Sequence, residues 1–293
     1  MNSCQKYFSA CVLALLTSAA FAQVPGLGTA SSFAVLSAAD GGGGAVTCTD
    51  STIIGDVGSS GEPASVVQTR CKISGATIAP VGDQVVDDFD SAYGDLKDVE
   101  CTTENTFSQT SLGDHTFTPG VYCFDAAVTE TDAVWTLSGG SNDTWLFKIG
   151  TQEPGALTGT NFSVVMEGGG EACDVYWWVD AAVTMTTSGF QGTILAGKAI
   201  TMTGLANPTA PFNGDALAKA AVTLTNFTVT GCESGSPIQP RKHCNQGVGN
   251  GPETCDPGNS NQDDFGSNPF PGLRTNDEAG GTPGNPGKKG GNK

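Results

Sequence analysis

Three short segments of the chain repeat one pattern, in which two threonines alternate with apolar residues. They are VTMT (residues 183–186), ITMT (200–203) and VTLT (222–225). Because successive side chains of a β-strand point to opposite faces, each segment predicts a strand with one apolar face and one threonine face. A spacing of roughly 20 residues is typical of a solenoid, whose coils bury their inner faces by stacking. A β-sandwich also has many short strands, but its fold does not require one tripeptide to recur at a regular interval along the chain.

A single segment, residues 81–99, departs from this pattern and predicts a helix. Its apolar residues recur at helical spacing, at Val85, Val86, Phe89, Tyr93 and Leu96. Acidic residues occupy the positions between them. We therefore expect an amphipathic helix lying along the predicted solenoid, with the adjacent Asp87 and Asp88 on its solvated side.

Composition divides the chain into three parts. Residues 1–22 have the pattern of a signal peptide, with Lys6, an apolar run and the small-x-small site AFA, so we expect a secreted protein without membrane insertion. Residues 23–232 are long enough for one β-rich domain with a full core. Residues 233–293 are rich in Gly, Pro and Asn with few apolar residues, and they predict a flexible tail.

Eight cysteines remain after the predicted cleavage, and an even number in an exported chain favours disulfides. No C-x-x-C pair supports zinc. Proximity along the chain suggests the pairs 48–71, 101–123 and 244–255, leaving 173 with 232, although the sequence does not fix the connectivity. One acidic cluster in the tail lacks the ligand spacing of a calcium loop. This cluster consists of Asp256, Asn259, Asn261, Asp263 and Asp264. We expect no metal and no cofactor.

The formal net charge is −17, and nearly all of the acidic excess lies in residues 23–232. Nucleic acids and anionic lipids are bound by clustered Lys and Arg, so this charge argues against both as partners. We expect a monomer. The basic residues of this region are Arg70, Lys72, Lys97, Lys148, Lys198 and Lys219.

Eight segments in the same order resemble the ice-binding proteins of the DUF3494 type. They cover nearly the whole of residues 23–232, and the tail lies outside the resemblance. The segments are LGTASSFAVLSA (27–38), STIIGDVG (51–58), the acidic helix, FTPGVYCF (117–124), DTWLFKIG (143–150), ACDVYWWV (172–179), FQGTILAGKAITM (190–202) and NGDALAKAAVTLTN (213–226).

The resemblance implies a fold and a function. The fold would be all-β dominated, a discontinuous right-handed β-solenoid of triangular section with one long α-helix packed alongside. A flat face of that solenoid would adsorb to the ice crystal surface and inhibit ice growth and recrystallisation.

The resemblance also implies candidate site residues, because some family members carry a T-[A/G]-x-[T/N] motif on the ice-binding face. TGTN (158–161) matches this motif fully, SGAT (74–77) nearly, and TGLA (203–206) in its first half. The predicted ice-binding residues come from these motif matches and from the downstream positions of the T-x-T segments, and they are Thr77, Thr158, Thr160, Asn161, Thr187, Thr203, Thr225 and Thr228. If the T-x-T pairs themselves form the face, the second choices are Thr184, Thr201 and Thr223.

Solenoids also carry enzymes, but the residues give little support to catalysis. His115 is the sole histidine of residues 23–232, and no G-x-S-x-G nucleophile motif is present. His115 is interpreted as a surface or turn residue. We expect no enzymatic activity.

A cell-surface adhesin or glycan-binding module on the same scaffold is the alternative function. Tryptophans can stack on sugars, and four are present: Trp135, Trp145, Trp177 and Trp178. Alternation places Trp177 and Trp178 on opposite sides of one strand, so at least two are expected in the core.

Overall fold

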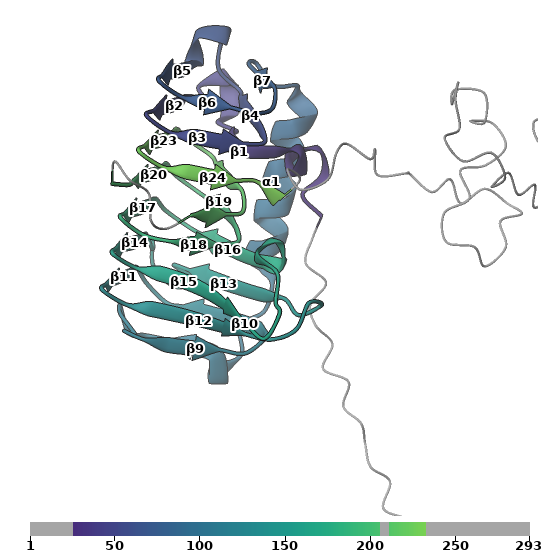
Figure 1. Ribbon diagram of the computed structural model, residues 1–293. Helices are drawn as coiled ribbons and strands as arrows, with labels where there is room; N and C mark the ends of the chain where they lie inside the picture. Colours follow the sequence, from purple (N-terminus) through teal and green to yellow (C-terminus); the bar gives the residue numbers. More distant parts are fainter. Residues whose placement is uncertain (1–25, 206–210, 233–293) are drawn as a thin grey trace, which may run out of the picture. The chain divides into compact units, whose positions relative to one another are not determined.

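Each strand of the fold is followed by a turn into a different sheet, and the chain returns to the first sheet one coil later. A computed structural model describes residues 26–205 and 211–232, within a compact unit that spans Met1–Gly235. Its strands stack in parallel with one long helix alongside (Figure 1). The predicted signal peptide, tail, tail cysteines and acidic cluster lie outside the described residues, as does the second unit, Ser236–Lys293.

The three faces of the stack are formed by separate parallel sheets. The nine-stranded sheet has the order β7 (Thr77–Ile78), β4 (Asp56–Ser59), β1 (Phe33–Ser37), β22 (Ala216–Ala218), β19 (Thr193–Ala196), β16 (Val175–Val179), β13 (Trp145–Ile149), β10 (Gly120–Phe124) and β8 (Thr106–Phe107). The seven-stranded sheet has the order β11 (Val128–Thr131), β14 (Leu157–Thr160), β17 (Val183–Thr186), β20 (Ile200–Thr203), β23 (Val222–Thr225), β2 (Val46–Thr49) and β5 (Val66–Thr69).

The third face, here called the mixed face, consists of two smaller sheets joined by a bridge between Ser163 and Gly189. One contains β9 (His115–Phe117), β12 (Val134–Ser138) and β15 (Ser163–Glu167); the other contains β18 (Phe190–Gln191), β21 (Phe212–Asn213), β24 (Thr228–Thr230), β3 (Thr52–Ile54) and β6 (Lys72–Ile73). Short 3-10 helices occupy some turns: η1 (Gly28–Ser32), η2 (Asp40–Gly42), η3 (Pro63–Ser65), η4 (Thr103–Asn105) and η5 (Ala172–Asp174).

The order of the coils does not follow the order of the chain. The helix α1 (Asp83–Asp98) joins β7 to β8, the two opposite edges of the nine-stranded sheet. The chain then builds coils back along the stack until the last one, β22 to β24, pairs with the first, β1 to β3. The first coil therefore lies inside the stack.

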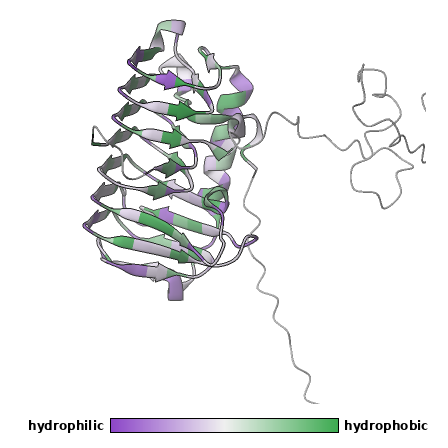
Figure 2. Cartoon of the chain, viewed as in Figure 1, coloured by the Kyte–Doolittle hydropathy of each residue, from purple (hydrophilic) through white to green (hydrophobic). Residues whose placement is uncertain are grey.

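Alternation along the strands separates two hydrophobic clusters. Trp177 points into the stack, where its ring lies 4.2 Å from that of Phe147. Its neighbour Trp178 points the other way, into the cluster between the nine-stranded sheet and α1, with Phe89 and Leu96 of the helix. The predicted opposition of the two tryptophans is confirmed. Figure 2 shows hydrophobic residues along the strands and hydrophilic residues along the corners of the stack.

The predicted helix over residues 81–99 is confirmed as Asp83–Asp98. Asp87 is exposed as expected, but Asp88 binds the start of the domain, because its Oδ2 accepts 2.7 Å hydrogen bonds from Thr29 N and Oγ1. These bonds hold the pKa of Asp88 below its ordinary value. No helix among the described residues is long and apolar enough to cross a membrane.

Three of the four predicted disulfides are present, joining Cys48 to Cys71, Cys101 to Cys123 and Cys173 to Cys232.

At the β11 end of the stack, a buried carboxylate replaces the usual apolar inward residue. Glu130 there accepts hydrogen bonds from Leu112 N at 2.6 Å and Ser111 Oγ at 2.9 Å. Because this carboxylate is hydrogen-bonded, the segment that bonds it can cover the end of the core.

Candidate functional site

The outward side of the seven-stranded sheet carries two columns of threonine. In every strand the first and third side chains are directed inward and the second and fourth outward, as in β17, where Val183 and Met185 are buried. The register aligns the outward residues in two columns, with Val67 as the single position that is not threonine. The first column is Thr129, Thr158, Thr184, Thr201, Thr223, Thr47 and Val67; the second is Thr131, Thr160, Thr186, Thr203, Thr225, Thr49 and Thr69.

The backbone of the sheet makes these columns regular. Adjacent parallel strands lie ~4.8 Å apart, and alternate residues of one strand lie ~6.6 Å apart. Threonine is branched at Cβ and therefore stiff at χ1, so its methyl and hydroxyl groups keep fixed positions. No charged residue occupies an outward position of these seven strands. The result is a regular and uncharged array of stiff side chains.

A third column of small residues borders the first threonine column. The residue before each strand is alanine or, at one end, serine. The carbonyls of five of the alanines accept a hydrogen bond from the neighbouring coil, as between Val183 N and Ala199 O at 3.0 Å. The alanines are half-buried, so their methyl groups extend the surface without rising above it. The column is Ala127, Ala156, Ala182, Ala199, Ala221, Ala45 and Ser65.

The opposite border is a corner column, formed by the residue after each strand. All of its members except Gly204 have a positive φ, between 50° and 53°. At one end Asn161 Nδ2 donates to Asp132 Oδ1 at 2.6 Å, and at the other end Arg70 pairs with Asp50. The hydrogen bond from Arg70 holds the pKa of Asp50 below its ordinary value. The corner column is Asp132, Asn161, Thr187, Gly204, Asn226, Asp50 and Arg70.

The structure brings most of the predicted ice-binding residues together, but not all of them. The residues on the two threonine columns are Thr158, Thr160, Thr203 and Thr225, together with the second choices Thr184, Thr201 and Thr223. The two interpretations of the T-x-T pairs overlap, because Thr203 and Thr225 are the second threonines of those pairs.

The other predicted residues lie elsewhere. Asn161 and Thr187 belong to the corner column, at the edge of the threonine array. Thr77 lies on β7, an edge strand of the nine-stranded sheet, and Thr228 lies on β24 of the mixed face. Neither position belongs to the threonine columns. The motif does not indicate where the chain turns from one sheet to the next, so it does not predict the sheet in which its last residue lies.

Sequence reasoning missed six threonines of the array: Thr47, Thr49, Thr69, Thr129, Thr131 and Thr186. A longer pattern would have found nearly all of them, since AVTCT (45–49), AVTET (127–131) and ALTGT (156–160) share alanine, an apolar residue and two alternate threonines with AVTMT (182–186). The inward residue between the threonines varies from Cys to Glu to Gly. That variation hides the repeat.

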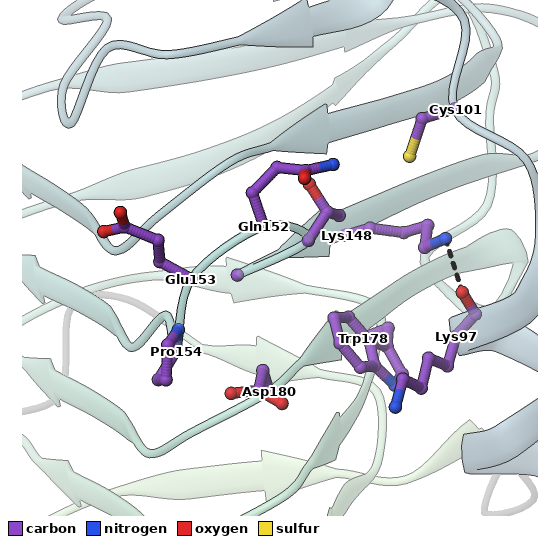
Figure 3. Close-up of a pocket in the computed structure, with 10 residues that line it drawn as sticks. Lys97, Cys101, Lys148, Gln152, Glu153, Pro154, Trp178 and Asp180 are labelled. Atoms are coloured by element: carbon purple, nitrogen blue, oxygen red, sulfur yellow. Dashed lines mark hydrogen bonds between the residues drawn. The ribbon is translucent and has the colours of Figure 1, made fainter.

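A hollow of about 470 Å³ beside the end of α1 is a second candidate site (Figure 3). It is lined by Lys97, Lys148 and Trp178, with Glu153 and Asp180 at its other side. Lys148 is already bound, because its Nζ donates to the carbonyl oxygens of Lys97 at 2.7 Å and of Val99. Burial lowers the pKa of this amine. The lysine thus caps the helix, and the lining contains no nucleophile paired with a base.

The residues considered for catalysis or sugar stacking do not form sites of their own. His115 lies in strand β9, partly exposed, with its ring 4.5 Å from that of Phe117. All four tryptophans are at most 2% exposed, so none offers a free indole face for a sugar. The described residues contain no group of three or more His, Cys, Asp or Glu placed to hold a metal ion.

Comparisons with known proteins agree in one family. Residues 35–230 match the family described as Ice-binding-like. The chain is 32% identical to the ice-binding protein K3-B1 of Typhula ishikariensis over 216 residues, 65% of this chain and 85% of that protein. It is also 32% identical to an ice-binding protein of Nostoc sp. strain HG1 over 197 residues, 64% of this chain and 67% of that protein. The crystal structure of an ice binding protein from an Antarctic biological consortium has a TM-score of 0.62 and 27% identity, over 74% of this chain and 95% of that chain.

Proposed function

Because the chain belongs to the Ice-binding-like family, we propose that it binds ice through the threonine columns of its seven-stranded sheet and thereby inhibits ice growth and recrystallisation. The observation that carries this proposal is the array itself, in which every outward position except Val67 is threonine. The array includes Thr158, Thr160, Thr184, Thr201, Thr203, Thr223 and Thr225.

The chemistry of the array suits a solid form of water. Each threonine presents a hydroxyl that hydrogen-bonds to water and a methyl that orders the water beside it. The ~4.8 Å and ~6.6 Å spacings of the columns are close to oxygen repeats on ice planes. Because the side chains are stiff, little conformational entropy is lost when ice is bound. An enzyme would need converging reactive groups, which the array does not have, and we infer no catalytic role.

The finer description of the fold is part of the same proposal. We infer that the coils form a discontinuous right-handed β-solenoid of triangular section. Parallel strands on three faces support it, as does the break in coil order at α1. A closed section of this kind keeps each face straight along the stack.

We also infer that the protein is exported and acts as a monomer. Three disulfides among the described residues support export, because disulfides persist in oxidising compartments. The acidic, uncovered surface of the domain supports the monomer, since like charges oppose self-association.

The test is ice recrystallisation inhibition and thermal hysteresis of the protein beside Thr158→Tyr and Thr203→Tyr. A tyrosine rises above the array and prevents flat contact, so both variants lose activity while their circular dichroism is unchanged. Thr136→Tyr is the matched control, because Thr136 points outward from β12 on the mixed face. A folded wild type that leaves ice growth unchanged refutes the proposal and directs attention to glycan binding. Equal losses in all three variants would refute the choice of face.

A further inference from the structure

We propose that the corner column belongs to the ice contact in the four middle coils, and that charged residues of the same column end this contact at both ends of the stack. This inference rests on the proposed function. It assigns a role to Asn226, Gly204, Asp132, Asp50 and Arg70, in addition to Asn161 and Thr187.

The corner residues are held as firmly as the threonines beside them. Six of the seven corner N–H groups donate to the carbonyl of the last threonine in the neighbouring coil, as from Asn161 to Thr186 at 2.9 Å and from Thr187 to Thr203 at 2.7 Å. The same bond links Asn226 to Thr49 at 3.0 Å. The parallel ladder therefore continues through the corner, and the column repeats at the spacing of the threonine columns.

Charge is distributed unevenly along this column. The strands β14, β17, β20 and β23 are followed by uncharged residues, namely Asn161, Thr187, Gly204 and Asn226. The strands at the two ends of the sheet are followed by charged ones: Asp132 after β11, and Asp50 and Arg70 after β2 and β5. A surface without charge thus reaches across the corner only in the middle of the stack.

Backbone conformation does not explain the lack of charge at Thr187 and Asn226. The left-handed conformation favours Gly, Asn and Asp, and it accepts the carboxylate of Asp as readily as the amide of Asn. Asn161 and Asp132 have nearly the same φ, 51° and 53°. Two of the four uncharged positions have a local reason, because a carboxylate at 161 could not donate to Asp132 and a Cβ at 204 would lie 2.0 Å from Asn226 O. At Thr187 and Asn226 the backbone conformation would accept an aspartate, so the absence of charge at these two positions supports a role of the surface.

The physical reason is hydration. An ionised carboxylate or guanidinium holds its water strongly, and removing that water is expensive. Water around an ion is oriented by the charge, whereas an amide or hydroxyl exchanges hydrogen bonds with ice on equal terms. A charge one residue from the second threonine column therefore opposes an ice-like layer there. Asp132 would limit the array at Thr131, and Asp50 at Thr49.

Isosteric substitutions test the inference with little change in shape. Asn226→Asp places a charge at the middle of the corner and should lower thermal hysteresis several-fold at neutral pH. Asp132→Asn removes a charge, retains an oxygen to accept the bond from Asn161, and should raise thermal hysteresis. Asn142→Asp, in the exposed turn between β12 and β13, adds the same charge elsewhere and should change nothing.

A pH series separates charge from structure. The carboxyl group of aspartate has a reference pKa of ~3.9. Asn226→Asp should therefore regain activity in acid as its carboxylate is protonated, relative to wild type at the same pH. A loss that persists in acid would mean that the substitution disturbed the fold, and it would overturn the inference.

Thr201→Tyr separates this inference from the proposed function. If Thr201→Tyr is inactive while Asn226→Asp equals wild type, the corner inference is wrong and the threonine face stands. If Thr201→Tyr keeps full activity, the proposed function fails and the corner inference fails with it. Unchanged activity in Asp132→Asn would remove the claim that charge limits the face.

Discussion

The seven-stranded sheet and the mixed face belong to the same coils, and both are exposed, yet they present different surfaces. Outward positions of the first are nearly all threonine, whereas those of the mixed face include Glu167, Lys72, Gln191 and Val165. Strand pairing is parallel on both, so the same backbone lattice underlies each. The lattice alone therefore does not make a binding face, and the side chains placed on it decide the function.

The contrast lies in how the side chains hold water. On the mixed face, the side chains of Val134 and Val165 are 40% exposed beside charged residues with long side chains. Asn213 Nδ2 donates a hydrogen bond to Gln191 Oε1 on the adjacent strand. Long side chains without fixed rotamers present no regular pattern of hydroxyls. On the seven-stranded sheet one branched residue repeats, and the pattern of water contacts repeats with it.

The largest expected effect comes from removing hydroxyls while keeping shape. The triple variant Thr184→Val, Thr201→Val and Thr223→Val retains branched side chains but cannot hydrogen-bond, so thermal hysteresis should fall several-fold. The pair Thr116→Val and Thr136→Val makes the same change on the mixed face and should leave activity at the wild-type value. Equal activity of the triple variant and wild type would show that the methyl groups suffice.

A smaller effect is expected at the alanine border of the array. Ala182 precedes β17, and its carbonyl accepts a 3.0 Å bond from Leu157 N, so the backbone there continues the ladder. A tyrosine at this position would rise beside the first threonine column and reduce thermal hysteresis less than Thr203→Tyr does. Val134→Tyr on the mixed face is the control, and identical behaviour of the two would place the border outside the contact.

The smallest effect on activity is expected from a disulfide away from the seven-stranded sheet. Replacing Cys173 and Cys232 by serine should lower the free energy of unfolding by about 2–4 kcal/mol, measured by denaturant titration. Activity at 0 °C should stay unchanged, because the remaining packing keeps the array in place.

The Cys48–Cys71 pair is the contrasting case. Cys48 is an inward residue of β2 between Thr47 and Thr49, so its loss should lower stability and also weaken activity. If the two double serine variants behaved alike in ice assays, the link between local order and activity would fail.

Much of the fold could be predicted from local patterns. The T-x-T segments are strands with buried apolar residues, and the helix begins and ends within two residues of its predicted limits. The helix includes Gly94, where a Cβ would meet open space. Two of the observed disulfides join cysteines that proximity suggested, and the third joins Cys173 to Cys232, the pair that remained.

The candidate site was less predictable, because faces are defined by contacts between coils. Alternation predicts that Thr201 and Thr203 share a side of their strand. It does not predict which strands lie next to that strand in a sheet. Motif spacing places Thr77 and Thr228 with the others, while the turns that follow β6 and β23 send them to other faces. Thr47 and Thr49 are not predicted by the local pattern, because their neighbours Thr223 and Thr225 in the array lie far along the chain.

The sequence by itself determined the strands, the helix, their inward and outward sides, and the residue that would repeat on the exposed side, because each depends on side chains a few positions apart. Only the tertiary structure decided that the first coil lies against the last, where Phe227 N donates to Ser51 Oγ across 176 positions at 3.1 Å. That pairing is set by packing of the whole core and by the path of α1. It is also what joins separate pairs of threonines into one continuous surface.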